Sequence, residues 1–79
     1  MRSLHTKPYQ AFVAVMVLAR QEADMSQHEL ARRIGKPQSF VSKYERRERR
    51  LDVAEFIKVA RALGLDPAKL IRRIDKALE

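Results

Sequence analysis

Residues 26–46 read SQHELARRIGKPQSFVSKYER, and this stretch decides how the chain folds. It begins with Ser26 and Glu29 at the spacing of a capping box, in which the hydroxyl accepts the backbone N–H three residues on and the carboxylate reaches back. Apolar residues then recur at helical spacing, and Gly35 ends the pattern where a left-handed turn is expected. A second helical pattern follows at once, over about 38–46. The stretch therefore predicts two short helices joined by a tight turn.

Apolar spacing predicts three further helices around this pair. They run from about Pro8 to Glu22, from Asp52 to Gly64, and from Asp66-Pro67 to Leu78. The residues expected to face the core are Phe12, Met16, Ala19, Ala23, Leu30, Ala31, Ile34, Val41, Tyr44, Val53, Phe56, Ile57, Ala60, Leu63, Leu70, Ile71, Ile74 and Leu78. With no strand pattern, internal repeat or linker, the sequence predicts one all-α domain over 1–79, with its core over about 9–70.

The composition limits what the chain can be. Its 79 residues suit a single domain, and the lack of cysteine excludes disulfides and thiolate metal sites. With 17 Lys and Arg against 10 Asp and Glu, the net charge is +7, which favours a nucleic acid or an anionic membrane as partner. The longest apolar run, Ala11 to Ala19, is far short of the roughly 20 residues of a membrane-spanning helix. No signal peptide is recognised, so we expect a soluble cytoplasmic protein.

Two short helices around a tight turn form a helix-turn-helix, in which the second helix enters the DNA major groove and the first crosses the backbone. The later helix has suitable side chains. Opposite Val41 and Tyr44, its outer face carries Gln38, Ser39, Ser42 and Lys43. Gln can bond to adenine N6 and N7, Lys to guanine O6 and N7, and Ser to several bases. These residues therefore predict sequence-specific binding of double-stranded DNA.

Basic residues concentrate on the same unit. Between Arg32 and Arg50 there are eight Lys or Arg and two Glu, a net charge of +6, so nearly all of the excess lies there. Neutralising DNA phosphates requires such clustering. The loop after the helix over about 38–46 contributes the arginines predicted to contact phosphates: Arg46, Arg47, Arg49 and Arg50. The backbone N–H groups after Ser26 suit a further phosphate, which Gln27 could clamp.

Three motifs recur together within Met25 to Leu65. They are Ser26-Gln27-x-x-Leu30-Ala31-x-x-Ile34-Gly35, then Gln38-Ser39-x-Val41-Ser42-Lys43-Tyr44-Glu45, and finally Ala62-Leu63-Gly64. In this combination the chain resembles the XRE family of helix-turn-helix regulators, which includes phage repressor and Cro proteins. The resemblance implies a compact five-helix, lambda-repressor-like domain that acts as a transcriptional regulator.

The resemblance also implies roles for individual residues. Gln27 would contact a phosphate or an outer base, the four polar residues of the later helix would face bases, and the loop after Glu45 would follow the DNA backbone. Arg20, near the end of the first helix, would pair with Glu45 and fix the recognition helix. Glu45 is the only acid on that helix, which agrees with such a pair.

The chain departs from the family pattern at four positions, and one of them is Leu51, where proline is common. Pro37 stands where a Ser or Thr cap is usual, and Phe40 stands where the family usually has a small polar residue. Arg47 occupies a position that is often glycine. A non-glycine residue in the left-handed conformation costs roughly 1 kcal/mol, so we expect a reshaped loop there. Phe40 is expected either to pack under the helix or to contact a thymine methyl group.

Two hypotheses of function remain open on the sequence alone. The first is a homodimeric regulator, by preference a repressor, on an inverted-repeat operator, with the dimer contact on the first or fifth helix. The second is an antitoxin-like or adaptor protein that mainly binds another protein, suggested by the wide apolar surface of the first helix. Val13, Val15, Val17 and Leu18 form that surface. No residue pattern suggests an enzyme, a cofactor or a metal site, and the motif argues against a membrane-bound domain.

Overall fold

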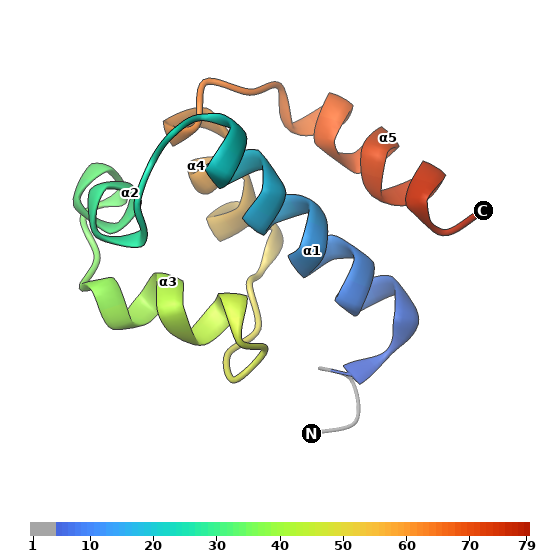
Figure 1. Cartoon of the computed structure of the whole chain (residues 1–79), viewed down its shortest axis with the longest axis horizontal. Coiled ribbons are helices and arrows are strands. Elements are labelled where there is room, and N and C mark those ends of the chain that lie inside the picture. The colour runs from blue at the N-terminus through green and yellow to red at the C-terminus, as the bar shows by residue number, and fades with distance from the viewer. Residues whose placement is uncertain (1–4) are drawn as a thin grey trace.

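The computed structural model describes residues 5–79, and within them the chain forms five α-helices and no strands. In chain order the helices are α1 (Lys7–Glu22), α2 (Gln27–Ile34), α3 (Gln38–Glu45), α4 (Val53–Ala62) and α5 (Pro67–Ala77). In Figure 1, α1 runs through the middle of the molecule, α5 lies along one side of it, and α3 forms the lower edge. The predicted all-α class and the helix-turn-helix at α2 and α3 are confirmed. The predicted domain also includes residues 1–4, which lie outside the described residues.

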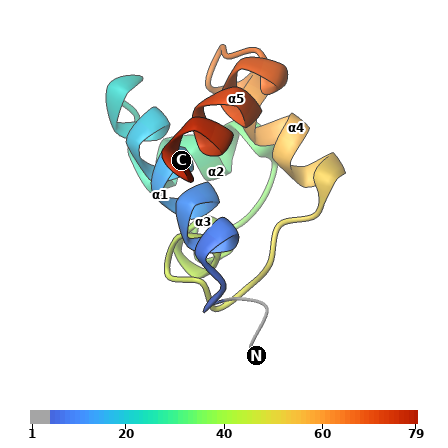
Figure 2. The same cartoon turned by 90° about the vertical axis from the view of Figure 1, so that its right-hand side faces the viewer.

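The helices pack around α1 and α4. Helix α1 contacts α3 and α5, α2 contacts α3 and α4, and α4 contacts α5. Seen end-on in Figure 2, α1, α4 and α5 surround one end of the molecule, and the loop before α4 crosses below them. The helix-turn-helix therefore rests on a scaffold made by the other three helices.

Four of the helices begin at a side chain that accepts a backbone N–H. These N-caps are Thr6, Ser26, Asp52 and Asp66, at the starts of α1, α2, α4 and α5. At α4 the capping box is complete, because Glu55 accepts the N–H of Asp52 at 3.0 Å and Asp52 accepts that of Glu55 at 2.7 Å. Helix α3 begins after Pro37, whose side chain has no acceptor.

The capping box predicted at Ser26 is only half formed. The Ser26 hydroxyl accepts the N–H of Glu29 at 3.0 Å. The Glu29 carboxylate instead binds Arg32 and Arg33, at 2.6 and 2.8 Å. Both cations lie one turn further along the same helix, and charge-assisted hydrogen bonds are stronger than a bond to a neutral N–H. Glu29 therefore neutralises two arginines of the basic segment.

The core draws side chains from all five helices, but the inner faces differ in part from prediction. Five positions expected inside are exposed: Ala23, Val53, Ile57, Ile71 and Leu78. Six residues that were not assigned to the inner faces are buried: Tyr9, Val13, Val15, Phe40, Leu51 and Val59. Ala23 lies beyond the end of α1, and the buried stripe of α4 runs through Phe56, Val59 and Ala60. Burial depends on which neighbour covers a helix, and apolar spacing alone does not reveal that neighbour.

The turn between α2 and α3 depends on the backbone of Gly35. Its φ is 69°, in the left-handed region, and a side chain built there would meet nothing within 4 Å. The constraint is therefore conformational and not a matter of space. Gly35 donates to the carbonyl of Arg32 at 3.2 Å, and Lys36 donates to that of Ala31 at 2.9 Å. These bonds close α2 and turn the chain directly into α3.

The loop after α3 is not reshaped, contrary to the prediction from its missing glycine. Arg47 itself adopts the left-handed conformation, with φ of 60°. Its N–H donates to the carbonyl of Tyr44 at 3.1 Å, and the N–H of Glu48 donates to that of Lys43 at 2.8 Å. These bonds satisfy carbonyls at the end of α3, so the conformation is retained although an L side chain makes it unfavourable.

We expect glycine to be more stable than alanine at position 47, by about 1 kcal/mol, because only alanine keeps the left-handed strain. In a helix interior the order is reversed, so Lys58→Gly should be less stable than Lys58→Ala by a similar amount. Urea unfolding of the four variants checks both orders. Equal or higher stability of Arg47→Ala relative to Arg47→Gly would contradict a strained conformation.

Candidate nucleic-acid interface

Helix α3 has one buried face and one open polar face. The buried side chains are Phe40, Val41 and Tyr44. Of the four predicted base-contacting residues, Gln38, Ser39 and Lys43 are exposed and Ser42 is half-buried. Figure 1 shows α3 at the edge of the molecule, with no other helix beyond it. The structure therefore brings these four side chains together on one side of an accessible helix.

A largely buried ion pair holds the end of α3 against α1. Arg20 donates from Nε and Nη2 to the two carboxylate oxygens of Glu45, at 2.7 and 3.1 Å. The two side chains are only 13% and 6% exposed. The hydrogen bonds that Arg20 donates to Glu45 raise the pKa of Arg20 above its usual range. The pair implied by the family resemblance is thus formed, and it is bidentate, with two guanidinium nitrogens bound to the two carboxylate oxygens.

The same carboxylate also ties α2 to this cluster. The Gln27 amide donates to Glu45 Oε1 at 2.8 Å, and Arg20 Nη1 donates to the carbonyl of Met25 at 2.8 Å. The sequence predicted that Gln27 contacts a phosphate or an outer base, and that contact stays a prediction. Sequence reasoning missed its bond to Glu45, because the two residues are 18 positions apart and no spacing rule connects them. Arg20, Gln27 and Glu45 together fix three helices at one point.

Arg49 is an anchor within the protein as well as a predicted phosphate contact. It donates to both carboxylate oxygens of Glu55, at 3.0 and 2.8 Å, and so joins the loop to the capping box of α4. Its guanidinium carbon lies 4.5 Å from the centre of the Phe40 ring, an arrangement that is favourable for a cation over an aromatic face. Phe40 is 8% exposed. Of the two places expected for this side chain, under the helix or against a thymine methyl group, it therefore takes the first and packs under α3.

The other three loop arginines have different surroundings. Arg46 pairs with Glu48 at 3.1 Å on the surface, and Arg47 is half-buried. The guanidinium carbon of Arg50 lies 4.9 Å from the centre of the Tyr9 ring. The four arginines predicted to contact phosphates therefore have different surroundings within the protein, and their contact with phosphates stays a prediction.

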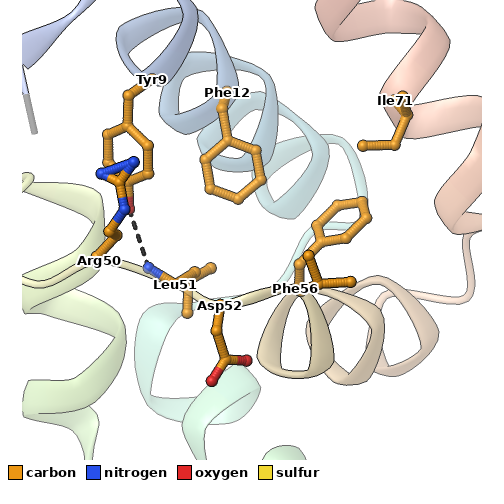
Figure 3. A pocket seen from close by; sticks show the side chains of 8 residues that line it. Tyr9, Phe12, Arg50, Leu51, Asp52, Phe56 and Ile71 are labelled. Carbon is orange, nitrogen blue, oxygen red and sulfur yellow. Dashed lines mark hydrogen bonds between the residues drawn. The ribbon is translucent and has the colours of Figure 1, made fainter. Parts of the chain in front are cut away.

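Tyr9 fastens this loop to the start of α1. Its hydroxyl accepts the N–H of Leu51 at 3.0 Å, as Figure 3 shows, and lies 3.5 Å from the carbonyl oxygen of Arg49. Sequence reasoning did not single out Tyr9. The available signal was a tyrosine on a helix face that is otherwise mostly aliphatic.

Within residues 5–79, no group of three or more His, Cys, Asp or Glu side chains is arranged to hold a metal ion. In the same part of the chain, no helix combines the length and the apolar character needed to cross a membrane.

The fold and the open polar face of α3 define a DNA-binding domain of the helix-turn-helix class. The family model HTH_3, described as helix-turn-helix, matches residues 18–70. That match covers more than half of the chain and includes α2, α3 and α4 in full. The chain belongs to this XRE-type family of helix-turn-helix proteins and is a DNA-binding transcriptional regulator.

Solved structures agree with the assignment. An XRE-family like protein from Pseudomonas syringae pv. tomato str. DC3000 superposes with a TM-score of 0.88 and is 44% identical, over 99% of this chain and 95% of that chain. Two structures of the clp gene regulator ClgR from Corynebacterium glutamicum superpose with TM-scores of 0.80 and 0.81 at 19% identity. They cover 91% and 94% of this chain, and 76% and 95% of their own chains, which shows a shared fold. No curated protein sequence matches the chain.

We expect Glu45→Ala to lower the free energy of unfolding by about 3 kcal/mol, because it leaves the largely buried Arg20 without its partner. The matched control is Glu48→Ala, which breaks the surface pair with Arg46 and should cost less than about 1 kcal/mol. Urea unfolding measures both changes. A similar loss of unfolding free energy in the two variants would contradict a larger contribution from the buried pair than from the surface pair.

The free energy of unfolding should fall with acidification between about pH 4.5 and about pH 2. Arg49 lowers the pKa of Glu55 through their hydrogen bonds, and Arg32 and Arg33 lower that of Glu29 from 4.5 to about 2. A carboxylate with a depressed folded-state pKa stabilises the fold above its unfolded pKa, and this stabilisation is lost as the pH falls through the folded value. Urea unfolding at several pH values should show a shallower decline for Glu55→Gln. An unchanged slope would show that the Arg49–Glu55 pair does not contribute.

Proposed function

We propose that the chain is a small repressor that binds an inverted-repeat operator as a homodimer, with α3 in the major groove. The observation that carries this proposal is the open face of α3, where Gln38, Ser39 and Lys43 are exposed beside one another on a helix held rigidly from behind. Side chains of this kind match the hydrogen-bonding edges of bases, with Gln suited to adenine and Lys to guanine.

The charge around α3 supports the same placement. The net charge of +6 between Arg32 and Arg50 surrounds the open face, and the start of α2 presents backbone N–H groups to a phosphate. Phosphate contacts fix the register of a protein on the duplex, whereas base contacts supply specificity. Within this proposal Arg46 and Arg47 contact phosphates next to α3, while Gln27 contacts a phosphate from α2.

The homodimer is proposed because the DNA-contacting surface of one chain is small. One recognition helix contacts only a few base pairs, and a two-fold pair doubles these contacts on half-sites one helical turn apart. The alternative of a protein-binding adaptor was suggested by the apolar surface of α1. Of its four residues, Val13 and Val15 are buried, Val17 is half-buried and Leu18 is 46% exposed, so this surface exposes one large apolar side chain and not a broad face. We therefore retain DNA recognition as the primary function.

Selection from a randomised duplex pool tests the proposal, and we expect an inverted repeat to be enriched. On the enriched site, Gln38→Ala and Lys43→Ala should each weaken binding by about 10- to 100-fold, since one bidentate base contact is worth roughly 1–3 kcal/mol. Gln38→Ala should also broaden the selected motif. The control is Lys58→Ala on α4, which removes the same charge as Lys43→Ala from an exposed site outside the interface.

Enrichment of no motif, with binding that only weakens as salt rises, would contradict sequence recognition and leave phosphate attraction alone. An equal loss of affinity for Lys43→Ala and Lys58→Ala would show that α3 has no special role. Binding to no duplex at all would favour the protein-binding alternative.

A further inference from the structure

The ring of Phe40 contacts two cations that come from the two segments flanking α3. Lys36 belongs to the turn before the helix, and Arg49 belongs to the loop after it (Figure 1). The Lys36 ammonium nitrogen is 5.5 Å from the centre of the ring, and the Arg49 guanidinium carbon is 4.5 Å from it. Both distances lie within the range of about 6 Å over which an aromatic ring attracts a cation. One side chain of α3 therefore holds a cation from each flanking segment.

The two cations differ in how far the protein neutralises them. Arg49 donates to both carboxylate oxygens of Glu55, at 3.0 and 2.8 Å, and to the carbonyl of Arg50 at 2.9 Å. Lys36 is exposed, and no acceptor among residues 5–79 binds its ammonium group. The pKa of Glu55 is lowered first by its hydrogen bonds with Arg49, and the charge of Lys36 adds a smaller effect. The ammonium group of Lys36 therefore retains its charge for an external anion.

The backbone of Lys36 is fixed on both sides. Its N–H donates to the carbonyl of Ala31 at 2.9 Å, and Gly35 before it has the left-handed conformation that ends α2. Pro37 follows, and a residue before proline is restricted to extended conformations. With its backbone fixed and its ammonium group over the Phe40 ring, Lys36 is held near the start of α3.

We propose that Lys36 contacts a DNA phosphate beside the start of α3, and that Phe40 is a positioning residue that holds the ammonium group there. The proposal rests on the proposed function, because it takes the placement of α2 and α3 on the duplex from it. It adds a residue to the phosphate contacts predicted from the sequence. It also gives the buried face of α3 a part in DNA binding.

The path of the chain supports a phosphate at this place. In a helix-turn-helix the first helix crosses the DNA backbone and the second lies in the major groove. The turn that joins them therefore passes the edge of the groove, where the phosphates lie. Lys36 belongs to this turn and precedes Gln38, the first predicted base contact, by two residues. An ammonium group with three donors suits the oxygens of a phosphate.

The ring contact makes such a phosphate contact easier to form. A lysine side chain loses rotamer freedom when it is immobilised at an interface. Part of that loss is complete in the free protein, because the ring already holds the ammonium group. Arg49 braces the ring in turn, since Glu55 fixes its guanidinium. Leucine at position 40 would fill apolar space but has no aromatic face, so Phe40→Leu separates packing from attraction of the cation.

Salt titration of binding to the selected duplex tests the phosphate contact. The logarithm of the affinity falls with the logarithm of the salt concentration, with a slope of about 0.9 for each phosphate neutralised. We expect Lys36→Gln to lower this slope by about 0.9 and to weaken binding about 5- to 10-fold at 0.1 M salt. The matched control is Lys58→Gln, which removes the same charge from an exposed site of α4 and should leave the slope unchanged.

A double-mutant cycle tests the positioning role of Phe40. Phe40→Leu should weaken binding about two- to fivefold, whereas Phe40→Tyr, which retains a ring, should bind like the wild type. In a Lys36→Gln background Phe40→Leu should cause little further loss, because the cation that the ring holds is absent. In a Lys58→Gln background its full effect should persist. An equal effect of Phe40→Leu in both backgrounds would show a purely structural role and overturn the positioning.

NMR of the free chain provides a test that depends neither on DNA nor on the stability of a variant. An aromatic ring shields protons that lie over its face. The ε-methylene protons of Lys36 should therefore resonate upfield of those of Lys58 in the wild-type protein. Equal chemical shifts for the two lysines would overturn the contact with the ring.

The two proposals fail in distinguishable ways. An enriched motif together with an unchanged salt slope for Lys36→Gln retains the proposed function and overturns the phosphate contact. Binding that enriches no motif, but whose salt slope falls in Lys36→Gln, removes sequence recognition and retains the phosphate contact. Binding to no duplex at all overturns both.

Discussion

The ion pair between Arg20 and Glu45 is the contact on which the orientation of α3 depends. It joins the end of the scaffold helix to the end of the recognition helix, and Gln27 adds α2 to the same carboxylate. The adjacent Tyr44 hydroxyl is buried with no hydrogen-bond partner among residues 5–79, and burial raises the pKa of Tyr44 above its usual range. A buried charge without its partner would be more costly still.

Local sequence signals accounted well for the architecture. Caps at Ser26, Asp52 and Asp66, together with the glycine at the end of α2, placed the helices and the turn between α2 and α3. The polar face of α3 was also recognisable, because its inner and outer residues separate cleanly at helical spacing. Such signals act within a few residues, so they can be read from a single sequence.

Contacts between distant segments could not be predicted in the same way. Arg49 was read as one of four similar arginines, although Glu55 and Phe40 hold it within the protein. Val53 was placed in the core, although this residue of the first turn of α4 is 74% exposed. In both cases the outcome depends on the three-dimensional packing of neighbouring elements, which residue spacing does not encode.

The loop that follows α3 is ordered before any partner arrives. Arg49 is held at Glu55, Arg46 is paired with Glu48, and the Tyr9 hydroxyl accepts the N–H of Leu51. A flexible arginine-rich loop would lose conformational entropy when it settled on a surface, about 0.5–1.5 kcal/mol for each long side chain immobilised. Here much of that ordering has been completed during folding. The domain can therefore associate with a rigid polyanion with little rearrangement. Its arginine contacts then cost less conformational entropy than those of a flexible loop would.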